Sequence, residues 1–460
     1  MPRFPFRTLL TCLSLIAVGG TAASAAAAPG AVDILFMVDD SSSMDGMQQK
    51  LTQQMQAFVG ALQTLPGGFP DVHIAVVSSD MGAYGDVSAQ IGCSRTGGDN
   101  GQFQAGPRQA CTDTTLDPGA TFISNVGGVA NYTGNLADVL SCILPLGSMG
   151  CGFEQQLASV VYALGAGGSP VPATNAGFLR PDAELAIILL TNEDDCSAPA
   201  ATTLYSLNGY LQSTTNPLGP VANYRCNQFG HLCKDPTSSH PDALITPPLS
   251  PPADASGNPL TLTLTQCQSD DDNCTGMLTP VSQFAYQIMS LKKDPSQIVV
   301  GAIVAPPGPY TVEWLPPSNP APGTSGELWP QVMHSCGPAG GDDVNPAGQI
   351  STDESFGDPA VRIAQWTQAF GDNGFTASIC DGDFSAALQT FATKIGQHLQ
   401  PLGAAPPAAP PGPRVCPPAH QTTGGAFRGA GCSAAGGRPG ASALLIAALG
   451  LIWSRRRRRP

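Results

Sequence analysis

The chain has 460 residues, of which 53 are glycine and 44 are proline, and only 12% of them are charged. This composition is typical of a loop-rich protein with a sizeable core, and it excludes a coiled coil or a helical bundle. All 34 acidic residues fall within residues 29–400, beside ten Lys and Arg, so this segment carries a net charge of −24. Such a charge argues against nucleic acid as a partner and leaves cations and basic ligands open.

The first 28 residues have the pattern of a secretory signal. Arg3 and Arg7 precede an apolar run at 9–18, and the alanine-rich stretch at 21–28 offers small-residue cleavage sites. A membrane anchor is the alternative, but the apolar run is too short to span a bilayer. We therefore expect an exported protein from which residues 1–28 are removed.

Strands and helices alternate through the segment 29–400. Continuous apolar runs predict buried strands at 32–38, 72–78, 185–190, 298–304 and 375–379. Helical spacing of apolar residues predicts helices at 47–62, 153–164, 281–291, 358–370 and 384–399. This alternation predicts one α/β domain with a doubly wound, mostly parallel sheet. Three long stretches rich in Gly and Pro and containing cysteines are expected to be disulfide-stapled loop insertions, at 84–150, 197–276 and 306–357.

Thirteen of the 14 cysteines lie outside the signal, which agrees with export to an oxidising compartment. Proximity in sequence predicts five disulfides, namely Cys93/Cys111, Cys142/Cys151, Cys226/Cys233, Cys267/Cys274 and Cys336/Cys380. Cys196 has no near partner in the sequence. The alternative is a loose zinc pattern of His231 and His240 beside Cys226 and Cys233.

Oxygen-bearing side chains follow the first three predicted strands. Asp39, Ser41 and Ser43 occupy alternate positions of a turn that leads into a helix, so all three can point at one ion. Asp80 follows the second strand, and the run Asn-Glu-Asp-Asp at 192–195 follows the third. Ligands of open parallel sheets bind outside the carboxyl ends of the strands, and oxygen ligands suit hard cations. The sequence therefore predicts a divalent-cation site here.

The Asp-x-Ser-x-Ser run at 39–43, between an apolar strand and a helix, resembles the metal-ion-dependent adhesion motif of the von Willebrand factor type A domain. The resemblance covers residues 31–400. It implies a bound Mg²⁺, or alternatively Ca²⁺ or Mn²⁺, with one open position to which a partner donates a carboxylate. It also implies a Thr before a later helix and an Asp after a later strand. The chain has Glu154 and Asn192 there instead, which implies a weaker or altered site.

Other uses of these residues stay open. The serines at 41–43 can cap the helix while Asp39 is solvated. The acidic run at 269–273 can hold Ca²⁺ or form a solvated loop. A metal-assisted hydrolase that uses Asp39 and the acids at 192–195 is the strongest enzymatic alternative. We nevertheless expect no enzyme, because the sequence shows no cationic clamp for a transferred group and places no histidine at the predicted site.

The C-terminal part changes character after residue 400. Residues 401–431 form a Pro/Ala/Gly-rich linker. Residues 432–460 contain Cys432, a short apolar run at 441–453 and five arginines, and they resemble the tripartite sorting tail of myxobacterial surface proteins. That resemblance implies Cys432 as the processing or anchoring point; an ordinary single-span anchor is the alternative.

Together these features predict a binding or adhesion protein at the cell surface or outer envelope, anchored in the membrane by its C-terminus. The expected partner is a surface or extracellular protein or a polysaccharide. A structural surface module with an empty site is the remaining alternative.

Overall fold

The computed structural model describes residues 30–84, 93, 95–106, 111, 115–206, 216–220, 222–271, 277–316, 328–341 and 355–399. The expected signal, linker and tail, with Cys432, lie outside these residues, as does Cys274. No helix in the described part of the chain is both long enough and apolar enough to cross a membrane.

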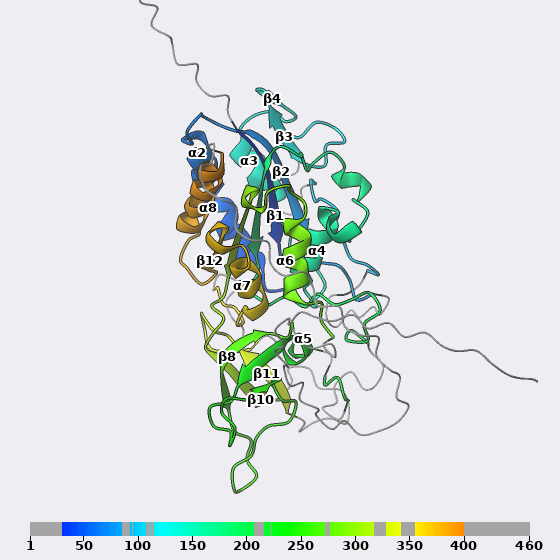
Figure 1. The fold of residues 1–460 in the computed structure, drawn as a ribbon, viewed down its shortest axis with the longest axis vertical. Coiled ribbons are helices and arrows are strands. Elements are labelled where there is room, and N and C mark those ends of the chain that lie inside the picture. The colour runs from blue at the N-terminus through cyan, green and yellow to red at the C-terminus, as the bar shows by residue number, and fades with distance from the viewer. Residues whose placement is uncertain are drawn as a thin grey trace, which may run out of the picture. The chain divides into compact units, whose positions relative to one another are not determined.

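A seven-stranded sheet forms the centre of the fold, with the strand order β12-β9-β5-β1-β2-β3-β4 (Figure 1). Five neighbouring strands are parallel, and β3 and β4 continue the sheet in antiparallel pairing. The α/β class with a mostly parallel sheet is thereby confirmed. The strands are β1 Ala31–Val38, β2 Asp71–Ser78, β3 Ile123–Val126, β4 Val129–Ala130, β5 Glu184–Leu190, β9 Ile298–Val304 and β12 Gly374–Ser378.

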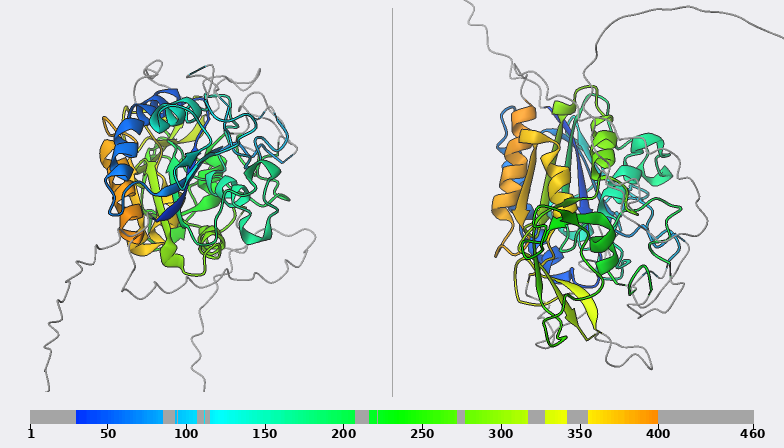
Figure 2. Two further views of the ribbon diagram at one scale, coloured as in Figure 1. Left: turned by 90° about the horizontal axis from the view of Figure 1, so that it is seen from above. Right: turned by 60° about the horizontal axis from the view of Figure 1, so that its bottom comes forward.

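Helices cover both faces of this sheet, which is why β1, β5 and β9 are buried along nearly their whole length. One face packs against α1 Asp45–Gln53, α2 Met55–Gln63, α3 Leu136–Ile143 and α8 Ser385–His398. Figure 2 shows α8 in orange beside α1 and α2 in blue. The other face packs against α4 Gln156–Ala163, α6 Val281–Met289 and α7 Val361–Gln368. Short 3₁₀ turns lie at Ala166–Gly168, Ala173–Asn175, Pro295–Gln297 and Gly371–Asn373.

The helix predicted at 47–62 is two helices. The backbone at Gln54 (φ −97°, ψ 0°) leaves regular helical geometry, and its N–H donates to Leu51 O, three residues back. Both halves keep their apolar residues against the sheet, so the hydrophobic spacing runs through the interruption unchanged. Periodicity alone therefore could not locate the break.

A second, five-stranded antiparallel sheet has the order β11-β10-β8-β6-β7. Its strands are β6 His231–Lys234, β7 Leu244–Ile245, β8 Leu262–Ser269, β10 Tyr310–Leu315 and β11 Trp329–Met333. The helix α5 Tyr224–Gly230 directly precedes β6. The stretches 197–276 and 306–357 both contribute strands, because β8 of the first pairs with β10 of the second. The sequence did not predict these strands, nor did it predict β3, β4 and α3 within 84–150. β8 alternates exposed threonine and glutamine with buried leucine, and so lacks a continuous apolar run.

Four of the five predicted disulfide pairings are not those of the structure. The bonds are Cys93–Cys151, Cys111–Cys142, Cys196–Cys226, Cys233–Cys267 and Cys336–Cys380. Only the last was predicted, and Cys196, which had no near partner in sequence, is bonded. In a doubly wound fold, loops far apart in the chain meet at one edge of the sheet, so sequence proximity is a poor guide. The zinc pattern is excluded as well, since Cys226 and Cys233 are both in disulfides.

Candidate functional site

The ends of β1 and β5 meet at the centre of the sheet. The two strands are parallel neighbours with Val38 opposite Leu190, and Asp39 N donates to Leu190 O at 2.9 Å. Strand order reverses at this point, because β2 lies on one side of β1 and β5 and β9 lie on the other. A crevice at such a switch point is where open α/β sheets bind ligands. Asp39 and Asn192 come from the loops after β1 and β5, and the place where these loops meet is called the crevice below.

Asp39 is fully buried and surrounded by hydrogen-bond donors. Its Oδ1 accepts from Ser41 N (2.8 Å) and Ser79 Oγ (2.9 Å), and its Oδ2 accepts from Thr191 Oγ1 (2.6 Å). Burial raises the pKa of this carboxyl, and these hydrogen bonds oppose the rise. No ion pair of the described residues includes Asp39. Within that part of the chain, its carboxylate is thus solvated by neutral groups and lacks a counter-cation.

Ser41 follows in the same turn and is only 3% exposed. Its hydroxyl lies close enough to the Asp39 carboxyl to lower the pKa of that group slightly, yet Ser41 Oγ has no partner in hydrogen-bonding geometry among the described residues. A buried hydroxyl without a partner is unfavourable by about 1–3 kcal/mol. This oxygen is therefore free to accept a ligand beside the buried carboxylate.

Ser43 and Asn192 lie together across the crevice. Asn192 Nδ2 lies 3.0 Å from Ser43 Oγ, and Ser43 Oγ lies 3.2 Å from Asn192 Oδ1. Ser43 is half-buried, whereas Asn192 is 1% exposed. These side chains satisfy each other, and an ion at this place would have to replace that contact.

The loop at 147–150 contacts α1 and the turn after β1. Gln48, buried in α1, donates from Nε2 to Asp39 O (2.7 Å) and Gly147 O (2.8 Å), and its Oε1 accepts from Gly147 N. Gly150 N donates to Asp40 O at 2.7 Å. A side chain at Gly150 would collide with the Asp40 carboxyl and carbonyl, so glycine is required for this approach.

Thr191 belongs to the candidate site, although the sequence did not point to it. It follows β5 directly, and its hydroxyl also accepts from Gln156 Nε2 (2.9 Å) at the start of α4. Glu154, the predicted substitute for the family's threonine, is 2% exposed in the loop before α4. The hydrogen bonds to Asp39 come from Thr191, Ser79 and Ser41 rather than from Glu154. The available signal was the hydroxyl residue directly after the apolar run of β5.

The acids at 193–195 serve structure rather than the crevice. Asp195 pairs with the buried Arg362 (3.0 Å) and accepts from Leu157 N at the start of α4. Asp194 accepts from Arg362 N (2.7 Å) and Ile363 N (3.1 Å), and so caps α7. Glu193 accepts a hydrogen bond from Asn223. These contacts tie the loop after β5 to α4, to α7 and to the residue that precedes α5.

His231 contacts the loop after β5, and the sequence did not predict this contact. Its Nε2 lies 2.8 Å from Asp194 Oδ2, and its Nδ1 lies 2.9 Å from Tyr310 Oη. All three side chains are buried. This row joins the loop after β5 to two strands of the second sheet, β6 and β10, and faces the protein interior.

Two other acidic positions also have local roles. Asp271 accepts from Val281 N and Ser282 N, both at 2.7 Å, and caps α6. Asp80 pairs with Arg95 at 2.8 Å. Asp272 and Asn273 lie outside the described residues. The part of the run 269–273 that the structure describes therefore offers a helix cap, not a set of oxygens turned to one ion.

The crevice fits a hard cation better than a soft one. No group of three or more His, Cys, Asp or Glu in the described ranges is arranged to hold a metal. The oxygens at the crevice are instead one carboxylate, two serine hydroxyls and an amide, and the buried Ser41 oxygen has no other partner among those residues. An all-oxygen set suits Mg²⁺ or Ca²⁺ and excludes a zinc or copper preference.

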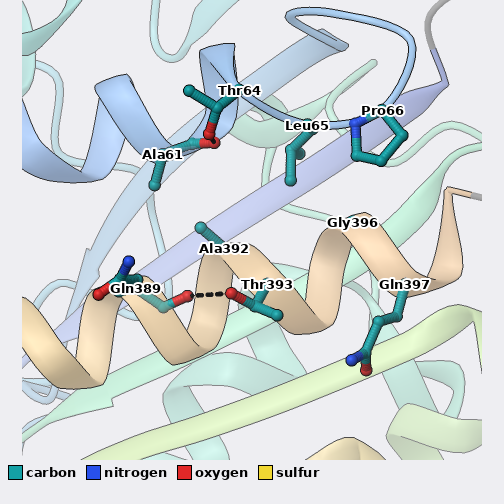
Figure 3. Close-up of a pocket in the computed structure, with 9 residues that line it drawn as sticks. All are labelled: Ala61, Thr64, Leu65, Pro66, Gln389, Ala392, Thr393, Gly396 and Gln397. Carbon is teal, nitrogen blue, oxygen red and sulfur yellow. Dashed lines mark hydrogen bonds between the residues drawn. The ribbon is translucent and has the colours of Figure 1, made fainter.

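A groove of about 470 Å³ lies elsewhere, between the end of α2 and α8 (Figure 3). Leu65 reaches over Gly396 there, and α8 ends beside Gly30, which precedes β1. The groove thus lies toward the amino end of β1, away from the crevice. No lining residue is charged, and the lining consists of Ala61, Thr64, Leu65, Pro66, Gln389, Ala392, Thr393, Gly396 and Gln397.

Comparisons with known proteins give distant likenesses of fold. No protein-family model and no curated protein matches the chain. It is similar to the vWF domain of the type V pili tip protein Mfa5 from Porphyromonas gingivalis, with 12% identity and a TM-score of 0.32, over 82% of this chain and 99% of that chain. It is also similar to the pilus adhesin RrgA from Streptococcus pneumoniae, with 11% identity and a TM-score of 0.23 over 60% of this chain. The match spans 39% of RrgA.

Proposed function

We propose that this protein is an exported surface-binding protein and that Asp39, Ser41 and Ser43 hold a divalent cation through which a partner is recognised. Asn192 completes the set once its contact with Ser43 opens. Mg²⁺ is the proposed ion, with Ca²⁺ or Mn²⁺ as alternatives. Anchoring through the tail at 432–460, with Cys432 as the attachment or processing point, belongs to the same proposal.

One observation carries this proposal: among the described residues, a buried hydroxyl without a partner, Ser41 Oγ, stands beside a buried carboxylate without an ion pair, Asp39. Both are unfavourable in the protein alone, and a cation relieves both at once. When bound, such a cation supplies a Lewis-acid position for an anionic oxygen of the partner. With Asn192 as an amide, the protein neutralises less of the ion's charge, which strengthens that attraction.

The test is calorimetric titration of the protein with MgCl₂, CaCl₂ and MnCl₂, together with urea unfolding. We expect Ser41→Ala to weaken or abolish cation binding while leaving cation-free stability unchanged or higher. The matched control is Ser159→Ala, since that buried hydroxyl donates to Ser78 O. It should lower stability and leave cation binding intact. Flat titrations of the wild-type protein with all three salts would refute the proposal.

A structural module with a closed site is the second candidate, and the contact between Ser43 and Asn192 favours it. In that case Ser43→Ala would lower stability and no cation would bind. A metal-dependent hydrolase finds less support, because Asp194 and Asp195 are engaged by the N-terminus of α7 and by Arg362. Turnover of a phosphate ester that Asp39→Ala abolishes would favour the hydrolase.

A further inference from the structure

An exposed methionine stands at the rim of the crevice. Met149 is 83% exposed, more than any other large apolar side chain in the described part of the chain. Its neighbours contact the serine turn, because Gly150 N donates to Asp40 O and Ser148 Oγ donates to Asp45 Oδ2 at 3.2 Å. Met149 therefore lies in a loop that contacts the turn carrying Asp39, Ser41 and Ser43.

The loop that carries Met149 is fixed on both sides. The Gln48 side-chain amide donates to Gly147 O and accepts from Gly147 N, and Cys151 forms a disulfide with Cys93. A backbone held in this way loses little conformational freedom when a partner covers the side chain. The methionine thioether also adapts to partner surfaces of different shape. The structure thus presents an exposed apolar side chain on a loop whose backbone is held on both sides of it.

We infer that the partner is a protein segment in which an apolar side chain adjoins a carboxylate, with the apolar side chain covering Met149. The inference rests on the proposed function, which assigns the carboxylate to the cation. An acidic polysaccharide would offer carboxylates but no aliphatic side chain to bury Met149. The segment 29–400 carries a net charge of −24, so it repels a polyanion more than a peptide with one carboxylate.

The test uses methionine-methyl NMR of the full chain with its disulfides formed. Met44 directly follows Ser43 and is fully buried, so its methyl reports the cation. The methyl of Met149 reports the partner. The probes are MgCl₂ and three blocked pentapeptides: Gly-Leu-Asp-Leu-Gly, Gly-Gly-Asp-Gly-Gly and Gly-Leu-Asn-Leu-Gly. An oligogalacturonate serves as the polysaccharide probe.

We expect Mg²⁺ to shift the Met44 signal, and the Leu-Asp-Leu peptide to shift the Met149 signal only when Mg²⁺ is present. The glycine-flanked and asparagine peptides should bind at least about tenfold more weakly. Met149→Ala should weaken Leu-Asp-Leu binding by a similar factor without changing the Mg²⁺ shift of Met44. The matched control is Val129→Ala, because Val129 is 74% exposed on β4, near the amino end of β2, and should leave peptide affinity unchanged.

The outcomes separate the two ideas. If Mg²⁺ leaves Met44 unmoved, the proposed function fails and this inference fails with it. If Met44 moves but Met149→Ala binds the Leu-Asp-Leu peptide as tightly as wild type, only the inference is overturned. Equal binding of the oligogalacturonate to wild type and Met149→Ala, with no peptide binding, would overturn it in favour of an acidic polysaccharide.

Discussion

The Thr191 hydroxyl at the end of β5 donates a 2.6 Å hydrogen bond to Oδ2 of Asp39 at the end of β1. Gln156 Nε2 donates in turn to Thr191 Oγ1, so a row of three buried side chains joins both strand ends to the start of α4. The orientation of the Asp39 carboxylate is therefore set by the neighbouring strand.

Replacing Thr191 with valine tests this row. The substitution keeps the shape but removes the donor to Asp39 and the acceptor for Gln156, so both lose a buried partner. We expect a loss of about 1–3 kcal/mol in the free energy of unfolding, measured in urea. The control is Thr393→Val on the exposed face of α8, which should unfold like the wild type. Equal stability of Thr191→Val and wild type would contradict the assignment.

Gly150→Ala tests the close approach of the 147–150 loop to the serine turn. A Cβ there would stand 2.8 Å from Asp40 O, a backbone atom that cannot rotate away. We expect a loss of about 1–3 kcal/mol in stability by thermal or urea unfolding. Gly60→Ala in α2 is the control. Apart from Gly60, its chain neighbours and the backbone of its own helix, no atom of the described residues lies within 4 Å of the place that the methyl group would take. The substitution should therefore stabilise the helix by up to about 1 kcal/mol.

The pair Arg362–Asp195 tests the structural role of the acids after β5. Arg362→Met leaves a buried carboxylate uncompensated, and we expect a loss of about 3–5 kcal/mol. In the Arg362→Met background, Asp195→Asn should lower the free energy of unfolding much less than it does in the wild type. A double-mutant cycle should therefore show strong coupling between the two residues. The pair Lys234–Asp242 is the control, because Asp242 is 97% exposed and should show no measurable coupling. Additive losses at Arg362 and Asp195 would argue against the ion pair.

Glu184 gives a pH prediction away from the crevice. Burial raises the pKa of its carboxyl to about 7 from 4.5, while Lys292 opposes the rise, and Oε2 has no hydrogen-bond partner in the described part of the chain. The folded state therefore binds the proton more tightly than the unfolded state, and stability falls as the pH rises from 4.5 to about 7. Glu184→Gln removes this loss. Above pH 7 it should be more stable than wild type, by on the order of 1 kcal/mol after solvent screening.

Below about pH 4.5 the Glu184→Gln variant and the wild type should have similar stability, because the wild-type carboxyl is then protonated in both states. Urea unfolding at a series of pH values checks both limits. A difference between the two proteins that stays constant from acid to neutral pH would rule out titration of Glu184 as its cause.

Four strands of the central sheet, β1, β2, β5 and β9, were predictable because each is buried on both faces. Such a strand is a largely apolar run, as in β9, which has no charged or polar side chain and whose predicted bounds match the observed ones. Three strands of the second sheet, β6, β8 and β10, escaped prediction because buried residues alternate along them with more exposed ones. Its pairing also joins segments more than 40 residues apart, for which the chain carries no local signal.

For the candidate site as well, part could be predicted from the sequence and part could not. Local spacing identified Asp39, Ser41 and Ser43, because the strand, the turn and the helix that place them follow one another directly in the sequence. The sequence by itself determined which oxygens follow β1. Only the tertiary structure decided that Thr191 orients Asp39, that Asp194 and Asp195 turn to α7 and Arg362, and that Met149 stands beside the crevice. Parallel strands bring together loops that are remote in the chain, so the partners of a strand end are fixed by sheet order and packing.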